Sequence, residues 1–144
     1  MNGQKTSKSM QRTTREAEKM TEKYIYAQEL IRALKLQVHC MAQAAQIVDP
    51  SIKLEKIEVC GSLGDFLKGE HERFRTPLDL CSGRYSDIDV VLTFNKPDEK
   101  VAEVLAKTEA QYCPCVYMPR IGVHEFVWNL PSHSPCKPEE RVTV

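Results

Sequence analysis

Two aspartates, Asp87 and Asp89, alternate with apolar residues at the start of residues 86–94. If this segment is a strand, alternation places both carboxylates on one face of a sheet. Neighbouring like charges repel and aspartate disfavours strands, so the pair is costly in a purely structural strand. A divalent cation removes that cost, because Mg²⁺ binds one or two protein carboxylates together with substrate phosphates. The pair therefore predicts a site for Mg²⁺ or Mn²⁺, and the alternative is two surface aspartates at a strand start.

A glycine and a serine follow the first strand that we expect in the chain. Residues 52–60 alternate between apolar and charged side chains, which predicts a strand that runs into Gly61 and Ser62. Glycine lets a backbone approach a ligand closely, and backbone N–H groups with a hydroxyl at such a turn can hold phosphate oxygens. A Gly-Ser pair alone is a weak signal, so its meaning depends on the two aspartates.

A long helix must precede this strand. From Thr13 or Thr14, apolar residues recur at steps of three and four, which predicts one helix of about nine turns. Asp49 and Pro50 end it, because proline cannot continue the helical hydrogen bonds. The same spacing is allowed in a coiled-coil interaction protein, which is the alternative. The apolar positions are Ala17, Met20, Tyr24, Ala27, Ile31, Leu34, Val38, Met41, Ala45 and Val48.

The length and composition of the whole chain suit a single domain. Its 144 residues are 42% hydrophobic, and we place the domain in residues 13–130 between a disordered basic tail, 1–12, and an irregular tail, 131–144. A helix is expected over residues 98–110.

The 20 basic and 20 acidic residues cancel, which argues against binding to nucleic acid or membranes through overall charge. No apolar run approaches the roughly 18 to 20 residues of a membrane span, so we expect a cytoplasmic protein, with the nucleus also open.

The six cysteines show no paired CxxC spacing. Without a signal peptide, reduced thiols are the expectation. A zinc site built from Cys113, Cys115, His124, His133 and Cys136 is the weaker alternative.

A strand followed by Gly61-Ser62, and later by the Ser-Asp-Ile-Asp-Val-Val-Leu of residues 86–92, resembles the DNA polymerase beta-type nucleotidyltransferase superfamily. The long helix leading into Cys60-Gly61-Ser62 is most similar to the cGAS-like branch, although noncanonical poly(A) and terminal uridylyl polymerases share the short motifs. The resemblance covers residues 15–95. It implies an α/β (α+β) fold with a mixed sheet packed against a long N-terminal spine helix. The family's second helical lobe has no counterpart in this sequence, which therefore resembles a truncated member.

Two features depart from the family pattern. The first is spacing, because 24 residues separate Ser62 from Asp87, about twice the usual number, which implies an insertion at residues 68–83. We expect this insertion to be a solvated surface loop, and the alternative is that the basic and aromatic residues of Glu70-His71-Glu72-Arg73-Phe74-Arg75 reach the substrate. The second is the third carboxylate that the family places on a neighbouring strand. Glu125 is the candidate, against the alternatives of a solvent-facing residue or an acid lying outside this chain, whereas Glu58 comes too early and is expected to face solvent.

The resemblance implies a Mg²⁺-dependent transfer of a nucleotide from a nucleoside triphosphate, such as ATP, to a hydroxyl acceptor. Asp87 and Asp89 would bind metal, Gly61 and Ser62 would bind the triphosphate, and Glu125 would complete the catalytic set. The acceptor would be a second nucleotide, as in cyclic dinucleotide synthesis in innate immunity, or an RNA 3′ end. Double-stranded RNA or DNA would be the activator. The alternative is a catalytically inactive nucleotidyltransferase-like scaffold or a truncated isoform.

Overall fold

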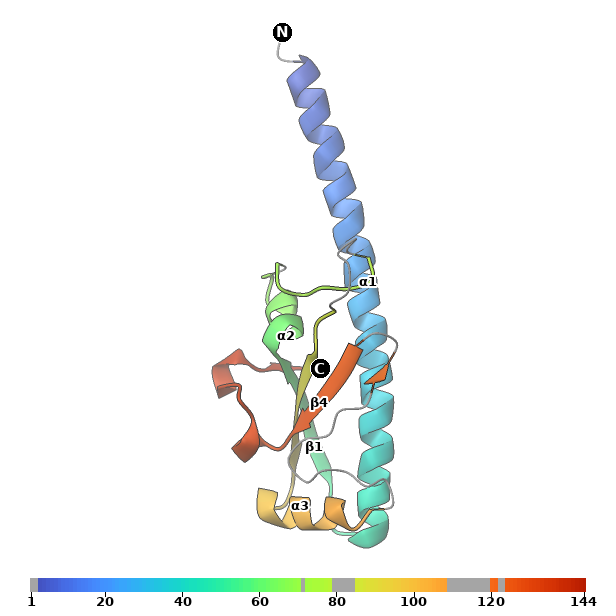
Figure 1. Cartoon of the computed structure of the whole chain (residues 1–144), viewed down its shortest axis with the longest axis vertical. Helices are drawn as coiled ribbons and strands as arrows, with labels where there is room; N and C mark the ends of the chain where they lie inside the picture. The colour runs from blue at the N-terminus through green and yellow to red at the C-terminus, as the bar shows by residue number, and fades with distance from the viewer. Residues whose placement is uncertain (1–2, 71, 79–84, 109–119, 122–123) are drawn as a thin grey trace.

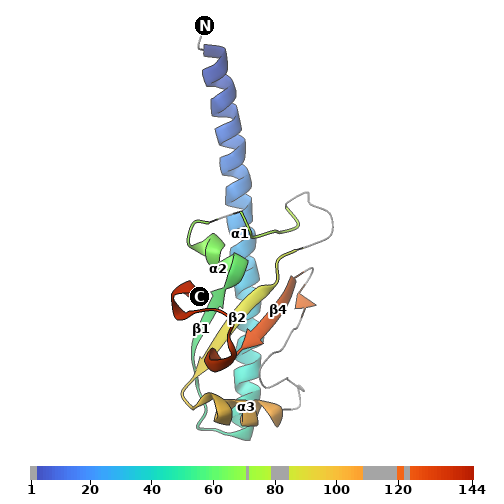
Figure 2. The same ribbon diagram turned by 60° about the vertical axis from the view of Figure 1, so that its left-hand side comes forward.

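The protein is a mixed α+β structure in which a long N-terminal helix lies along a mixed sheet (Figures 1 and 2). The computed structural model describes residues 3–70, 72–78, 85–108, 120–121 and 124–144. The strand order is β3-β4-β2-β1-β5. The helices are α1 (Gly3–Val48), α2 (Gly61–Leu67), α3 (Asp98–Ala106) and the short 3-10 helices η1 (Pro131–His133) and η2 (Pro138–Glu140). The strands are β1 (Leu54–Cys60), β2 (Ile88–Phe94), β3 (Arg120–Ile121), β4 (His124–Asn129) and β5 (Val142–Thr143).

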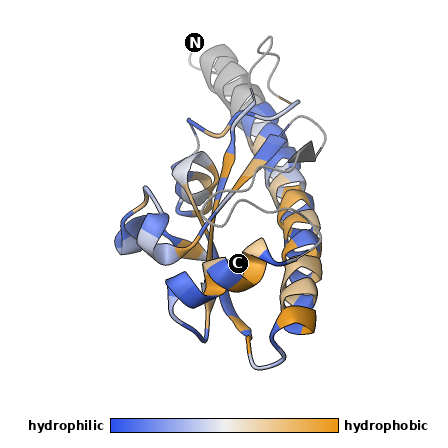
Figure 3. Ribbon diagram, turned by 60° about the horizontal axis from the view of Figure 1, so that its bottom comes forward, coloured by the Kyte–Doolittle hydropathy of each residue, from blue (hydrophilic) through white to orange (hydrophobic). Residues whose placement is uncertain are grey.

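Helix α1 carries the predicted apolar stripe, which is buried along the middle of the helix. Leu34 and Val38 are completely buried, whereas Ala17, Tyr24 and Val48 at the two ends of the stripe are exposed. The helix ends at Val48 as predicted, and the following Asp49 carboxylate accepts hydrogen bonds from the backbone and hydroxyl of Ser51. Figure 3 shows hydrophobic residues gathered on the strands and on the part of α1 beside them.

The start of α1 corrects the predicted boundary. The helix begins at Gly3 rather than near residue 13, so a helical segment replaces most of the disordered tail predicted for residues 1–12. Residues 4–12 contain no proline or glycine. Once a helix has formed, each further residue adds one hydrogen bond at the cost of fixing one residue. An existing helix can therefore extend through a segment that has no apolar period.

The sheet has two differently covered faces. On β2, Ile88, Val90 and Leu92 belong to the core that also contains the buried residues of α1. Asp89 and Val91 therefore point to the opposite face, because successive side chains of a strand alternate. Strand β1 pairs antiparallel with β2, and β4 pairs parallel with β2 on its other side. Helix α3 lies across one end of the sheet and is shorter than the predicted 98–110, because it ends at Ala106; residues 109 and 110 lie outside the described residues.

The C-terminal segment, residues 131–144, forms a strap on the side of the sheet away from α1 (Figure 1). An irregular tail was predicted, but the strap contains two 3-10 helices and ends in β5, which pairs with β1. The Val144 N–H also donates to the Ile57 carbonyl at 3.1 Å. Within the strap, the Arg141 guanidinium donates to the Cys136 carbonyl at 3.0 Å. These backbone contacts order a segment whose sequence has no apolar period.

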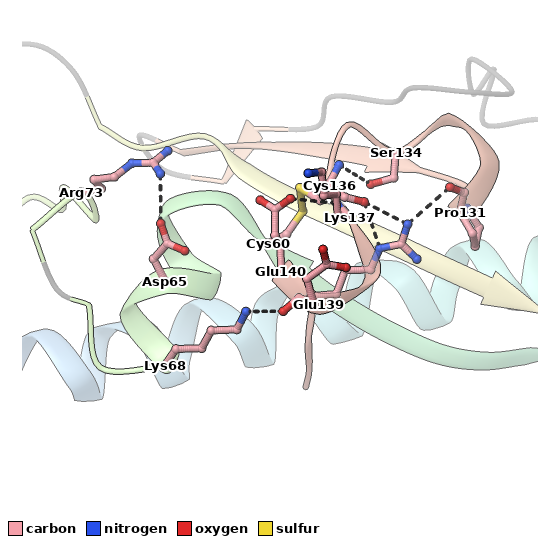
Figure 4. The surroundings of a disulfide bond; sticks show 11 residues. Cys60, Asp65, Lys68, Arg73, Pro131, Ser134, Cys136, Lys137, Glu139 and Glu140 are labelled. Atoms are coloured by element: carbon pink, nitrogen blue, oxygen red, sulfur yellow. Dashed lines mark hydrogen bonds and ion pairs between the residues drawn. A yellow bond between two sulfur atoms is a disulfide. The ribbon is translucent and has the colours of Figure 1, made fainter.

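A disulfide between Cys60 and Cys136 fastens the strap to the end of β1 (Figure 4). The expectation of reduced thiols is therefore wrong for this pair. Their Cα atoms lie 6.4 Å apart, within the range that a disulfide spans. A separation of 76 residues gave no local sequence signal for the bond. Cys40 is free and exposed, while Cys81, Cys113 and Cys115 lie outside the described residues.

No helix among the described residues contains a stretch long and apolar enough to cross a membrane.

Candidate functional site

The Gly61-Ser62 turn and the aspartate pair meet at one point of the sheet. Antiparallel pairing of β1 and β2 sets Cys60 opposite Asp89, so the turn that follows Cys60 begins beside Asp89. Gly61 has a φ of +67°, a conformation that residues with side chains rarely adopt. A Cβ atom at Gly61 would lie 2.5 Å from Asp89 Oδ2. Glycine is therefore required here both by its backbone conformation and by the close carboxylate, and half-buried Ser62 follows in the first turn of α2.

The two aspartates differ in their environment. Asp87 is exposed just before β2 begins, whereas Asp89 is half-buried on the strand. Burial raises the pKa of the Asp89 carboxyl, the negative charge of Asp87 raises it further, and the Arg73 guanidinium opposes both. Ionised Asp89 is thus held where its charge is poorly solvated and repelled by a neighbour. A bound cation would relieve both costs.

Arg73 is one of the basic residues for which contact with the substrate was the alternative to a solvated loop. It belongs to the insertion, and its Nη1 donates to Asp65 Oδ2 at 3.0 Å (Figure 4). Asp65 lies on α2, three residues after Ser62, so the guanidinium stands over the helix that follows the glycine turn. The next residue, Phe74, is completely buried, with its ring centroid 5.1 Å from that of Phe66. The predicted solvated loop is therefore wrong at Phe74, whereas Arg73 beside it is exposed.

Ser86 attaches the insertion to the residue before Asp87. Its hydroxyl accepts a hydrogen bond from the Arg75 backbone N–H at 2.8 Å and donates to the Arg73 carbonyl at 3.1 Å. Its backbone N–H donates to the Arg75 carbonyl at 3.2 Å. These three bonds fix the path of the chain at Arg73 relative to the start of β2.

His124, the first residue of β4, is buried and contacts the backbone of Ser86. Its Nδ1 lies 2.8 Å from the Ser86 carbonyl oxygen, and since a carbonyl only accepts, Nδ1 carries the proton. Nε2 is buried and has no hydrogen-bond partner among the described residues. Burial lowers the pKa of the imidazole, while the Ser86 carbonyl and the charge of Asp87 oppose that shift. Neutral His124 therefore helps to position the backbone that carries the aspartates.

Glu125 shares a face of the sheet with the aspartate pair. Parallel pairing sets Asp89 opposite Val127, so Glu125, two residues earlier, points to the same side. It is half-buried, and Arg120 of β3 lies opposite it in register. No group of three or more His, Cys, Asp or Glu side chains within the described part of the chain is arranged to hold a metal ion. The structure thus brings Glu125 to the predicted face without completing a three-ligand group.

Glu58 is buried, although a solvent-facing residue was predicted. Only 7% of it is exposed, and Lys56 Nζ lies 3.5 Å from its Oε1. Thr143 of the strap pairs with it across β1 and β5. The prediction failed because alternation identifies a face of a strand, but not whether a distant segment covers that face.

Comparison of the chain with protein-family models, with curated proteins and with solved structures finds no match.

Proposed function

We propose that this domain is a Mg²⁺-dependent nucleotidyltransferase, which transfers a nucleotide from a nucleoside triphosphate to a hydroxyl group. The observation that carries the proposal is the pairing of Cys60 with Asp89. It joins the glycine-serine turn and the aspartate pair, which lie far apart in the sequence, into one surface. A coiled-coil protein without a nucleotide site would not need this juxtaposition, nor a glycine packed against a half-buried carboxylate.

The residues present suit Mg²⁺ that arrives with a nucleotide. Asp87 and Asp89 supply two hard oxygen ligands, and Mg²⁺ in nucleotide sites commonly takes one or two carboxylates and completes its shell with phosphates and water. The raised pKa of Asp89 agrees with a carboxylate whose negative charge is only partly balanced by the Arg73 guanidinium. When bound, the ion would neutralise charge on the phosphates and on the departing pyrophosphate.

In this proposal each residue of the site has a role in binding or catalysis. Asp87 and Asp89 would hold Mg²⁺, and the Gly61 backbone with the Ser62 hydroxyl would bind the β and γ phosphates. An acceptor hydroxyl would attack the α-phosphate in line and release pyrophosphate. Glu125 faces the same side of the sheet and is our candidate for receiving the hydroxyl proton. The acceptor is a second nucleotide or an RNA 3′ end.

Titration calorimetry of ATP and GTP with Mg²⁺ tests the proposal. We expect binding by the wild-type chain and at least a tenfold loss of affinity in the Asp87→Ala, Asp89→Ala double variant, because each lost charged contact is worth roughly 1.5 kcal/mol or more. Gly61→Ala should also weaken binding, since its new Cβ displaces Asp89. Gly69→Ala is the matched control, because Gly69 also has a positive φ but its added Cβ would meet nothing within 4 Å. Equal binding by wild type and the double variant, or binding by neither, would overturn the proposal.

A second candidate is a nucleotide-binding domain that does not catalyse transfer. It is favoured by the lack of a three-ligand acidic group within the described part of the chain. Pyrophosphate release separates the two functions. Nucleotide binding that depends on Asp87 and Asp89 without pyrophosphate release, in the presence of candidate acceptors, would establish the second.

A further inference from the structure

We infer that Arg73, contributed by the insertion, binds the terminal phosphates of the nucleoside triphosphate and that Asp65 holds its guanidinium when no nucleotide is bound. This inference rests on the proposed function and adds a residue that sets selectivity for triphosphates. It starts from the Arg73 Nη1 to Asp65 Oδ2 distance of 3.0 Å on α2.

The backbone of Arg73 is fixed, but its side chain is free to change partners. Two features hold the backbone: the Ser86 hydroxyl donates to the Arg73 carbonyl at 3.1 Å, and the adjacent Phe74 is completely buried. The Arg73 side chain itself is 72% exposed and that of Asp65 is 25% exposed. Because the Arg73 end of the pair is exposed, the guanidinium can exchange its partner without moving out of a buried position.

The position of Arg73 suits a phosphate better than a purely structural role. The guanidinium lies over α2 and close enough to Asp89 to stabilise that carboxylate. The guanidinium therefore contacts the helix that follows the glycine turn, and its charge acts on Asp89. A guanidinium presents a planar fork of donors that matches phosphate oxygens in a bidentate contact.

Lys68, the residue that follows α2, contacts the strap and not Asp65. Its Nζ donates to the Glu139 carbonyl of the strap at 2.7 Å (Figure 4). Removing either basic residue changes the net charge equally, but only Arg73 of the two is paired with Asp65 and acts on the charge of Asp89. Lys68→Ala is therefore a matched control for Arg73→Ala.

The test is the affinity of the full chain for ATP and for AMP, both with Mg²⁺, by titration calorimetry. We expect Arg73→Ala to weaken ATP binding about tenfold or more, since a charged hydrogen bond is lost, and to leave AMP binding unchanged. Arg73→Lys should retain part of the affinity, and Lys68→Ala should match the wild type. Circular dichroism of each variant checks that the fold is retained.

Asp65→Asn distinguishes phosphate binding from a structural ion pair. If Asp65 competes with phosphate for the guanidinium, its removal should strengthen ATP binding a few-fold, opposite to the effect of Arg73→Ala. If the pair only stabilises the fold, both variants should lower affinity together, which would overturn the inference. ATP binding that Arg73→Ala leaves intact but Asp87→Ala, Asp89→Ala abolishes would also overturn it and leave the proposed function standing. Failure of the wild-type chain to bind ATP would remove both.

Discussion

Asp89 is half-buried and has the negative charge of Asp87 nearby, and both features affect the pKa of its carboxyl. Burial and the charge of Asp87 raise its pKa above the ordinary 3.8. The folded chain therefore binds this proton more tightly than the unfolded chain. The resulting stabilisation is complete below pH 3.8 and is lost as the pH rises through the raised pKa. At neutral pH the ionised carboxylate consequently destabilises the fold, as expected for a residue kept for binding rather than for stability.

We therefore expect Asp89→Asn to melt at a higher temperature than the wild type at pH 7, because the amide carries no charge to desolvate. Below pH 3.8 the difference should shrink, since wild-type Asp89 is then protonated in both states. Thermal melts at pH 7 and pH 3 measure this. Glu55→Gln removes an exposed charge from the adjacent strand β1 and is the control. A lower melting temperature for Asp89→Asn at pH 7 would contradict the assignment.

Some features of the candidate site follow from the sequence and others do not, for a physical reason. The outward direction of Asp89 follows from strand alternation, and the turn at Gly61 follows from the end of a strand, so both are local properties. Asp87 was predicted on the same strand face, but it precedes β2, which begins at Ile88. The contact of Arg73 with Asp65 depends on the path of the insertion, which Ser86 and buried Phe74 determine. No periodicity encodes such a path.

Among the elements, α1 shows how far a periodic pattern determines burial. Steps of three and four correctly placed the core stripe, because a helix that packs on one side of a sheet must bury one face. Leu34 lies on that stripe and is completely buried, whereas Leu36, two residues later, is 65% exposed. The helix start was not predictable in the same way, because residues 3–12 have no pattern that packing could use.

Leu34→Ala should lower the free energy of unfolding by about 2 to 5 kcal/mol, through lost burial and the cavity left behind. Leu36→Ala removes the same atoms from the exposed face and should change stability by no more than about 0.5 kcal/mol. Urea unfolding of the two variants measures the difference. Equal effects would show that α1 does not pack on the sheet through the Leu34 face.

For the whole molecule, the strap determines how far the face of the sheet away from α1 is exposed to solvent. Glu58 was predicted to face solvent and is buried, because β5 pairs along β1 and the Cys60–Cys136 bond holds the strap in place. Both contacts join segments that are distant in sequence. Pairing of this kind is encoded by the complete fold and not by any local motif.

Removal of the disulfide should lower the stability of the whole domain. A loop of 76 residues, when opened, restores entropy to the unfolded chain, and we expect a loss of about 4 to 5 kcal/mol in Cys60→Ser, Cys136→Ser. Reductant should destabilise the wild type and leave this variant unchanged in urea unfolding. Cys40→Ser, at a cysteine that is free and exposed, is the control and should retain the wild-type response to reductant. A wild type that is indifferent to reductant would contradict the bond.

The same bond determines how the chain would respond to mechanical force. If the molecule is pulled from its two ends, tension passes directly from Cys60 to Cys136 through the sulfur atoms, and the 76-residue separation between them carries no load. About 250 Å of contour, at about 3.3 Å per residue, stays out of the extension until the bond is reduced. Strands β2 and β4, with Asp89 and Glu125, lie inside this unloaded loop, whereas β1, which pairs with β2, lies on the loaded path.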